Sequence, residues 1–396
     1  MTCIKLPTAT RTLAPYTLQT APPCPTPSAP PAFNRVAFAA AHVVSDPRAD
    51  IDPGTGSALD WDATLAYRRH LWAHGFGVAE AMDTAQRGMG LDWPTALELT
   101  ARSADAARDI RGALLFAGAG TDHLPQGAAT TLADVRAAYD MQCAAIERAG
   151  ARIILMASRA LASVARGPDD YLDVYAHVLA QVREPVILHW LGAMFDPALD
   201  GYWGHADLDR ATRVCLDVIR ASAAKVDGIK VSLLDAARET SMRAQLPPRV
   251  RMYTGDDFNF AALIGGDAGG HSDALLGIFD AIAPAASAAL SALTRDDRAG
   301  FDAILAPSVP LSRHLFSAPT RFYKTGVVFL AWLNGHQSHF TMLGGQQGAR
   351  GIVHLAQAFR LADAARLLQD PERATQRMRA LLGIHGIGEE ESACRT

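Results

Sequence analysis

The sequence predicts an α/β fold, a (β/α)8 TIM barrel followed by an all-helical C-terminal region. Short apolar runs alternate with longer amphipathic stretches from Arg35 onward, and no further strand follows Ile278. This alternation is typical of βα units that build a parallel sheet, and eight units over about 245 residues match the size of a closed barrel. An open doubly wound sheet is the alternative, but no G-x-G-x-x-G follows the first strand.

The eight expected strands each combine a short apolar run with flanking turn residues. They cover 35–44, 77–82, 113–118, 152–157, 185–190, 227–232, 250–254 and 274–278. Between them, Asp60 can cap a helix that ends at Gly75, Pro94 suits a first helical turn, and Gly150 can close a helix over 131–149. Beyond 285 the apolar spacing is helical throughout.

The chain divides by composition into three regions. Residues 21–32 hold six prolines in twelve positions, so we expect an extended segment there and place 1–32, a proline-rich leader, outside the core. The barrel covers 33–284 and the helical region 285–396.

Composition excludes several classes of protein. The chain has 396 residues, of which 49% are hydrophobic and 20% charged, and a net charge of −4, which predicts a soluble protein with no basic surface for nucleic acid. No apolar run is long enough to span a membrane. The five cysteines are scattered and include no C-x-x-C, so we expect neither a disulfide framework nor a structural zinc site, and a cytoplasmic location.

Lysine is scarce in this chain, since only four of the 37 basic residues are lysines and the others are arginines. Lys230 shares its side of the strand with Gly228 and Ser232, while the apolar residues of that strand alternate with them. Lys230 is therefore expected inside the barrel, where desolvation lowers the pKa of an amine and favours nucleophilic attack. A lysine held by a carboxylate for stability is an equal alternative. The other lysines are weaker candidates. Lys5 lies in the leader, Lys225 precedes its strand and so falls at the rim opposite the expected site, and Lys324 lies in the helical region.

Several motifs, in their order along the chain, resemble the dihydrodipicolinate synthase and N-acetylneuraminate lyase superfamily over roughly residues 35–385. VDGIKVSLLD is similar to its G-I-K strand, and RMYTGDDFNF to the G-D/E-D turn after the next strand. GAGTDHL resembles its third-strand turn, and RFYKTGVVFLAWLNG its C-terminal lysine-bearing helix. The resemblance implies a lyase without a cofactor, a Schiff base on Lys230, and a homo-oligomer, a dimer or tetramer.

The resemblance also exposes two departures. His189 stands where the family has a proton-relaying tyrosine, and it is either that relay or a residue that fills the barrel. The family's loop for the keto-acid carboxylate aligns with residues 83–87, which keep one hydroxyl, Thr84, and add an acid, Asp83. Asp83 would repel a substrate carboxylate unless a cation intervenes, which counts against pyruvate.

Other polar residues are expected at strand ends, where barrel enzymes place their sites. Glu80 shares the parity of Met82 and should point inward, as an acid or a partner for Lys230. Arg159 could bind a carboxylate or phosphate, or pair with Asp169 or Asp170. The remaining candidates are Asp122, His123, Asp256 and Asp257, the last two of which also suit a turn.

The favoured function is a lyase or aldolase in which Lys230 forms an imine with a small carbonyl substrate, a keto acid or a sugar-derived aldehyde or ketone, and a C–C bond is made or broken. His189 and Thr84 would move protons, and Glu80, Asp83, Arg159, His123 and Asp256 would contact the substrate. Two alternatives remain. One is a metal-dependent barrel enzyme that uses His42, Glu80, Asp83, His123 and His189. The other is a barrel that binds a metabolite without catalysis. His70 and His74 fall at the opposite rim and are read as helix-end residues.

Overall fold

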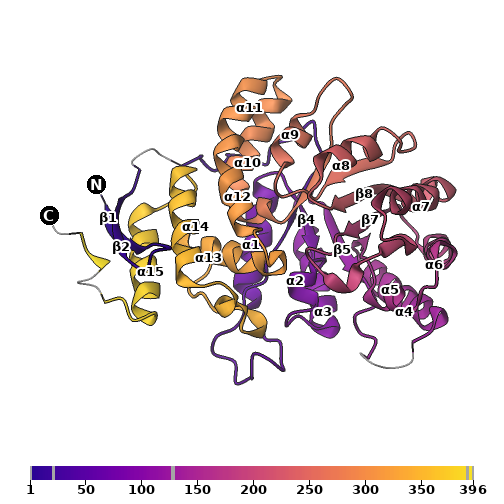
Figure 1. Ribbon diagram of the computed structural model, residues 1–396, viewed down its shortest axis with the longest axis horizontal. Coiled ribbons are helices and arrows are strands. Elements are labelled where there is room, and N and C mark those ends of the chain that lie inside the picture. Colours follow the sequence, from indigo (N-terminus) through magenta and orange to yellow (C-terminus); the bar gives the residue numbers. More distant parts are fainter. Residues whose placement is uncertain (1, 20–22, 126–129, 389–391, 395–396) are drawn as a thin grey trace.

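The computed structural model describes residues 2–19, 23–125, 130–388 and 392–394, and its centre is a closed barrel of eight parallel strands (Figure 1). The expected fold class is confirmed, and each expected strand overlaps an observed one. Their order around the barrel follows the chain, with the last strand pairing with the first. The strands are β3 (Ala37–Ala40), β4 (Gly77–Glu80), β5 (Leu115–Ala119), β6 (Arg152–Leu155), β7 (Val186–Leu191), β8 (Val226–Ser232), β9 (Arg251–Thr254) and β10 (Asp273–Leu276).

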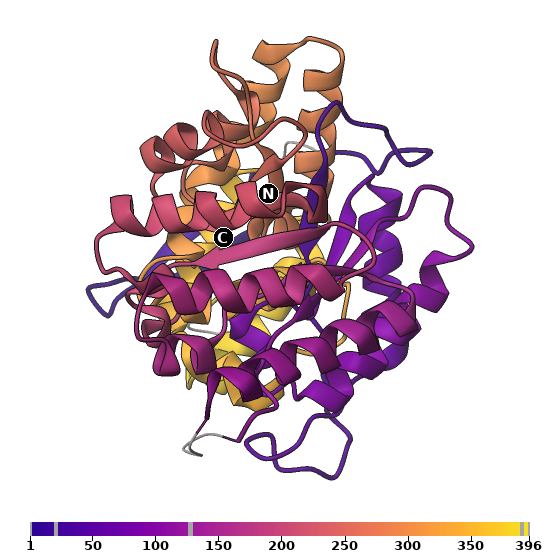
Figure 2. The ribbon, with the colours of Figure 1, turned by 90° about the vertical axis from the view of Figure 1, so that its right-hand side faces the viewer.

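Helices flank the strands, and Figure 2 looks onto α4, α6 and α7. Their ends follow the capping residues: the Asp60 carboxylate accepts a hydrogen bond from the Ala63 amide at the start of α1, and Gly150 ends α4 with a φ of 91°. The helices are α1 (Trp61–Ala73), α2 (Thr84–Arg87), α3 (Trp93–Ala107), α4 (Leu132–Ala149), α5 (Arg159–Val164), α6 (Pro168–Gln181), α7 (Leu208–Ala221), α8 (Ala236–Arg243), α9 (Phe260–Gly265) and α10 (Ile278–Thr294).

In the described part of the C-terminal region, five further α-helices follow α10. They are α11 (Arg298–Leu305), α12 (Val309–Leu315), α13 (Tyr323–Leu333), α14 (Ile352–Ala364) and α15 (Pro371–Ile384). Every residue of α13 is buried, because this helix lies between the barrel and the outer helices. Within the described ranges, no helix is long and apolar enough to cross a membrane.

The first residues form a hairpin that the sequence analysis missed. β1 (Cys3–Pro7) pairs with β2 (Leu13–Thr17), and Ile4 and Leu6 are fully buried in the main core. The Arg360 guanidinium on α14 donates hydrogen bonds to the carbonyl oxygens of Leu6 and Pro7. Placing all of 1–32 outside the core was therefore wrong, because the alternating apolar residues of β1 give this short strand one buried face.

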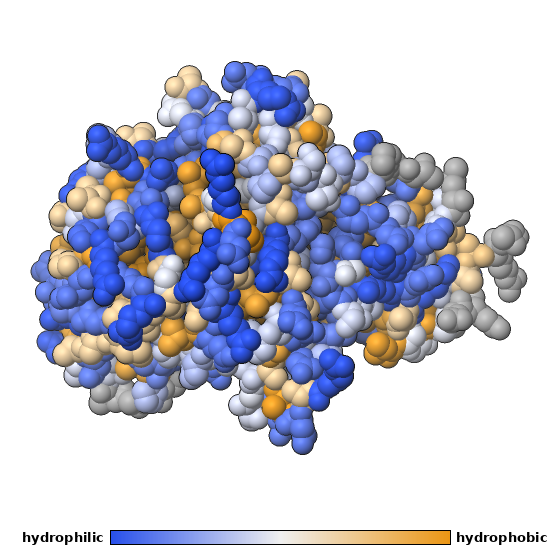
Figure 3. Space-filling model, turned by 180° about the vertical axis from the view of Figure 1, so that it is seen from behind, coloured by the Kyte–Doolittle hydropathy of each residue, from blue (hydrophilic) through white to orange (hydrophobic). Residues whose placement is uncertain are grey.

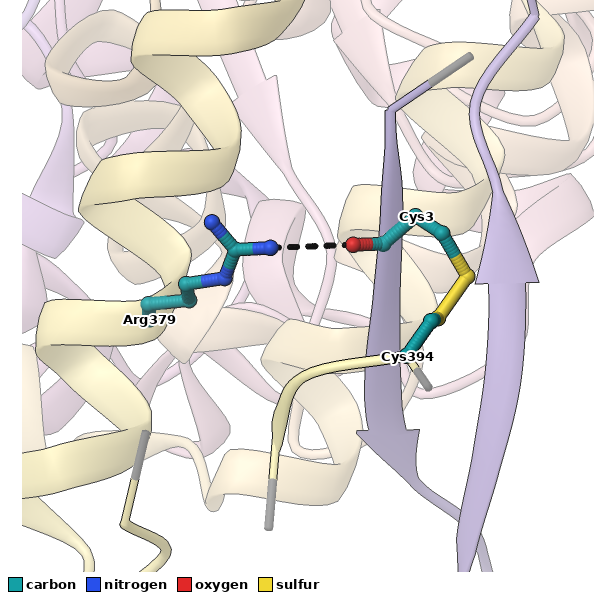
Figure 4. The surroundings of a disulfide bond; sticks show 3 residues. All are labelled: Cys3, Arg379 and Cys394. Carbon is teal, nitrogen blue, oxygen red and sulfur yellow. Dashed lines mark hydrogen bonds between the residues drawn. A yellow bond between two sulfur atoms is a disulfide. The ribbon is translucent and has the colours of Figure 1, made fainter. Parts of the chain in front are cut away.

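A disulfide between Cys3 and Cys394 joins the two ends of the described chain (Figure 4). Next to it, Ile4 pairs with Ala393 as an antiparallel bridge, and the Arg379 guanidinium donates to the Cys3 carbonyl oxygen at 3.0 Å. The expectation that the cysteines form no disulfide was wrong for this pair. Spacing patterns carry no information about two cysteines separated by 391 residues.

Candidate functional site

Lys230 lies inside the barrel, on the side of β8 that alternation predicts. Its side chain is buried, and its Nζ lies 3.8 Å from Sδ of Met82, which belongs to the cluster that fills the barrel interior. Ile229 and Val231, on the other side of the strand, pack into the core beneath the helices. The amine therefore sits in an apolar interior, close to the ends of the strands.

Burial lowers the pKa of the Lys230 amine, and the charge of Lys324 lowers it further, while Asp83 and Asp257 act in the opposite direction. Asp257 follows β9. Burial raises its pKa to about 7, although its carboxylate accepts a hydrogen bond from the Ile278 amide at 2.9 Å. The amine of Lys230 and the carboxyl of Asp257 are thus close enough for the charge of each to act on the pKa of the other.

A second lysine reaches this site, which the sequence analysis did not foresee. Lys324 begins α13, and its Nζ lies 2.9 Å from Asp83 Oδ2 and 3.3 Å from Asp280 Oδ2 and donates to the Ala40 carbonyl. Burial acts to lower its pKa, but the two carboxylates outweigh burial and raise it. Lys324 is therefore an ammonium ion, whereas the pKa of Lys230 is shifted in the opposite direction. The expected place of Lys324 in the helical region is confirmed, but its contact with Asp83 was not expected, because helical periodicity does not show where α13 packs.

Asp83 follows β4 and is buried beside this ammonium group. It also forms a hydrogen bond with the hydroxyl of Tyr323, the neighbour of Lys324 on α13. The cation needed to offset Asp83 is thus present, but its charge is shared with Asp280.

Asp280 extends the polar network away from Lys230. Its carboxylate accepts hydrogen bonds from the His42 amide at 2.7 Å and from the His42 ring, whose Nδ1 lies 2.9 Å from Oδ1. The other ring nitrogen of His42 lies 3.2 Å from Oε1 of Gln337. Burial acts to raise the pKa of Asp280, but His42 and Lys324 outweigh it and hold the pKa well below its usual range.

His189 lies on β7 in register with Lys230. Its Nε2 is 3.2 Å from the Ser232 hydroxyl, and burial, together with the charge of Lys230, holds its pKa well below 6.5. The imidazole is therefore neutral and can form hydrogen bonds without carrying a charge. Thr84 begins α2 beside this site, and its side chain lies outside the described residues.

Glu80 does not point into the barrel, contrary to the expectation. Its carboxylate accepts hydrogen bonds from the Arg68 guanidinium at 2.7 and 2.9 Å and from the Ser103 hydroxyl at 2.8 Å, beneath α1 and α3. The residue after it, Ala81, has a φ of 46°, so the strand's alternation ends at this point. Met82 consequently faces the interior together with Ala79, whereas Glu80 does not.

Two other expected substrate contacts are engaged with the protein itself. The Asp256 carboxylate accepts hydrogen bonds from the amides of Phe258 and Asn259, each at 2.9 Å, and from the Asn259 side chain. It therefore shapes its own turn rather than presenting a free carboxylate to a substrate. The ring of His123 is 2.8 Å from the Gln142 amide and lies in the loop after β5.

A cavity of about 1010 Å³ opens at the C-terminal ends of β4 to β7. Among its lining residues are Arg87, Asp122, Met156, Arg159 and Arg321. Arg159 pairs with Asp196 at 2.5 Å, and not with Asp169 or Asp170 as the sequence had suggested. The cavity and the expected site thus share the end of the barrel where active sites of this fold lie.

Lys230 does not itself line the cavity. Met82 contacts the lysine and Met156 lines the cavity, and both pack against Gly118, where an added Cβ would lie 2.7 Å from Met156 Sδ and from Met82 Cα. The two methionines therefore connect the surroundings of the amine with the wall of the cavity. Methionine side chains are flexible, so they can move to admit a ligand.

The metal hypothesis lacks a ligand cluster. In the described ranges, no three His, Cys, Asp or Glu side chains are placed to hold a metal ion. Of the five residues the hypothesis named, Glu80 pairs with Arg68, His42 with Asp280 and Asp83 with Lys324.

Comparison with solved structures shows a fold similar to that of the dihydrodipicolinate synthase family. YagE from E. coli K12, a prophage protein of that family solved in complex with pyruvate, matches at a TM-score of 0.65 and 14% identity, covering 85% of this chain and 100% of its own. Dihydrodipicolinate synthase from Aquifex aeolicus matches at a TM-score of 0.59 and 11% identity, covering 89% of this chain and 98% of its own. The enzyme from Acinetobacter baumannii, solved in complex with pyruvate, matches at a TM-score of 0.58 and 15% identity, covering 84% of this chain and 99% of its own. The resemblance expected from the motifs is confirmed for the fold.

No curated protein matches the chain in sequence. A family model described as a protein of unknown function, DUF993, matches residues 4–387. The match includes all of the hairpin strand β1 except Cys3, the whole barrel and the C-terminal helices. The chain therefore belongs to the DUF993 family, whose barrel here has the fold of dihydrodipicolinate synthase.

Proposed function

We propose that this protein is a lyase that forms a Schiff base between Lys230 and a small carbonyl substrate. The observation that carries the proposal is an amine buried at the strand ends of the barrel, with its pKa lowered by burial. An uncharged amine can attack a carbonyl carbon, whereas an ammonium ion cannot. Lys324 is the internal contrast, because two carboxylates keep it charged.

The chemistry needs one proton donor close to Lys230. Attack of the amine gives a carbinolamine, and loss of its hydroxyl as water gives the imine once that oxygen receives a proton. Asp257 is the nearby carboxyl whose pKa, about 7, suits this transfer. The protonated imine then accepts the electron pair of a breaking C–C bond, and the reverse sequence makes the bond.

His189 and Thr84 remain proposed partners in proton transfer. A neutral His189 can pass a proton along its hydrogen bond to Ser232 without holding a charge between steps. Arg159 and His123 remain proposed substrate contacts, of which Arg159 lines the cavity. Relatives of this fold bind pyruvate, but the extra acid Asp83 favours a different substrate here.

The test is reductive trapping with borohydride in the presence of a panel of keto acids, aldehydes and sugar phosphates. A carbonyl compound that forms an imine becomes a permanent secondary amine of known added mass. We expect an adduct on the wild type and none on Lys230→Met, while Lys225→Met, altered far from the site, still forms it. Absence of an adduct across the panel would favour a barrel that binds a metabolite without this chemistry.

A further inference from the structure

Two cavities meet at one corner of the barrel mouth. The cavity of about 1010 Å³ and a second one of about 220 Å³ are both lined by Arg159, Asp196 and Arg321. Arg159 begins α5, Asp196 follows β7 and Arg321 precedes α13. We refer to Arg159, Asp196 and Arg321 as the arginine corner.

The Arg159 guanidinium is held at one edge only. Its Nε donates to Asp196 Oδ2 at 2.5 Å, and Asp196 is itself fixed by accepting from the Ala198 amide at 3.2 Å. In the part of the chain that the structure describes, neither Nη of Arg159 donates a hydrogen bond to the protein. A guanidinium group that is fixed through Nε, and whose two Nη atoms are available as hydrogen-bond donors, can bind a carboxylate or a phosphate through two parallel hydrogen bonds.

Arg321 adds a second positive charge. Its side chain is exposed and lies 4.9 Å from the centre of the Phe322 ring, and no carboxylate among the described residues pairs with it. The arginine corner therefore contains two guanidinium groups and one carboxylate. A third arginine that lines the large cavity, Arg87, is neutralised by Asp122 at 2.5 Å.

Around Lys230, in contrast, acidic side chains outnumber the other basic ones. Lys324 is shared by two carboxylates, Asp83 and Asp280, and Asp257 adds a third acid that titrates near neutral pH. A substrate carboxylate attached directly to the reacting carbonyl would enter this acidic group without a free cation to bind it. An anionic group at the far end of the substrate would meet the arginine corner instead.

We propose that the arginine corner binds an anionic group, a carboxylate or a phosphate, that the substrate carries several atoms away from its carbonyl. The location of that carbonyl rests on the proposed function of Lys230. The substrate class is therefore an aldehyde or ketone with a remote acid, in place of a short 2-keto acid. The size of the large cavity, at the upper end of the roughly 300–1,000 Å³ usual for ligand sites, accommodates such an extended molecule.

Binding of anions that contain no carbonyl tests the corner independently of imine chemistry. Inorganic phosphate and glutarate are titrated calorimetrically into the wild type, Arg321→Gln, Arg159→Gln and Lys230→Met. We expect at least one of the two probes to bind the wild type and Lys230→Met alike, and each arginine variant to bind it at least roughly tenfold more weakly. The probe that binds distinguishes phosphate from carboxylate.

Arg148→Gln is the matched control, because Arg148 is an exposed arginine in the last turn of α4, outside both cavities. Arg321→Gln breaks no ion pair of the described residues, so we expect it to fold as the wild type does, which the Tm of the variant checks. The proposal is overturned if neither anion binds the wild type, or if Arg321→Gln and Arg159→Gln bind as the wild type does.

A second arm tests the substrate class by trapping. Pyruvate, succinic semialdehyde and glyceraldehyde 3-phosphate are compared at equal concentration with borohydride. We expect a remote-acid compound to label Lys230 faster than pyruvate, and this preference to disappear in Arg321→Gln. Faster labelling by pyruvate would overturn the inference while leaving the imine proposal intact. If the anions bind but no carbonyl compound labels Lys230, the imine proposal fails while the anion site stands.

Discussion

At the level of single residues, the site contains two buried lysines whose pKa values are shifted in opposite directions. Lys230 contacts the apolar Met82 and has a lowered pKa, whereas Lys324 contacts two carboxylates and has a raised one. Burial acts on both amines, and the carboxylates close to Lys324 decide the difference. The same ammonium group offsets Asp83, the acid that the sequence placed in the carboxylate-binding loop.

Removing Lys324 should destabilise the fold strongly. Lys324→Met leaves Asp83 and Asp280 buried without their cation, and breaking a buried pair in this way costs about 3–5 kcal/mol. Urea denaturation measures the free energy of unfolding. Lys225→Met is the control, because Lys225 donates one hydrogen bond to the Val182 carbonyl and should cost about 1 kcal/mol. Equal losses in the two variants would argue against a structural charge cluster.

At the scale of elements, the strands were predictable and the details at their ends were not. Each predicted apolar run forms a strand, and the alternation of residues along β8 correctly predicted that Lys230 points into the barrel. Alternation misplaced Glu80, because the left-handed backbone of Ala81 interrupts it one residue later. Lys324 was missed for another reason: its role depends on where α13 packs, which helical periodicity does not reveal.

Glu239 illustrates how a buried acid fastens one element to others. On α8, its carboxylate accepts hydrogen bonds from Thr254 at the end of β9, at 2.9 Å, and from Ser272 before β10, at 2.7 Å. Burial raises its pKa to about 7, above the ordinary value of 4.5. The folded state therefore holds the proton more tightly than the unfolded state does.

Because the folded pKa of Glu239 is the higher one, its contribution to stability is fully present below pH 4.5 and is lost as the pH rises to about 7. Glu239→Gln stays neutral and should remove this part of the pH dependence, an effect of about 3 kcal/mol between pH 4.5 and 7. Urea unfolding of both proteins across this range measures it. Parallel stability profiles for the two proteins would show that Glu239 is ionised in the fold.

At the scale of the whole molecule, the two ends of the chain meet at the side of the C-terminal helices, away from α4 to α7 (Figure 1). The hairpin β1–β2 packs on α14, and the disulfide Cys3–Cys394 ties it to the other end. Neither contact could be predicted from local sequence, because both join segments more than 300 residues apart. Polar side chains predominate on the face in Figure 3, with smaller apolar areas among them. Assembly as a dimer or tetramer stays a prediction.

The disulfide should stabilise the molecule, because it restricts the unfolded chain across 391 residues. Cys394→Ser, measured under oxidising conditions, should lose about 2–5 kcal/mol of unfolding free energy. A reductant should lower the Tm of the wild type and leave that of Cys394→Ser unchanged. Cys24→Ser is the control, since Cys24 is free. A wild type that ignores the reductant and contains five titratable thiols would contradict the bridge.

The proposed lyase activity requires Lys230 to be the amine that reacts with the substrate carbonyl. The scarcity of lysine makes this unusually direct to examine, because peptide mapping after borohydride trapping has to distinguish just four sites: Lys5, Lys225, Lys230 and Lys324. We expect one adduct, on the peptide that contains Lys230, and no adduct on Lys230→Met. An adduct on Lys324 in place of Lys230, or no adduct with any carbonyl compound of the panel, would contradict it.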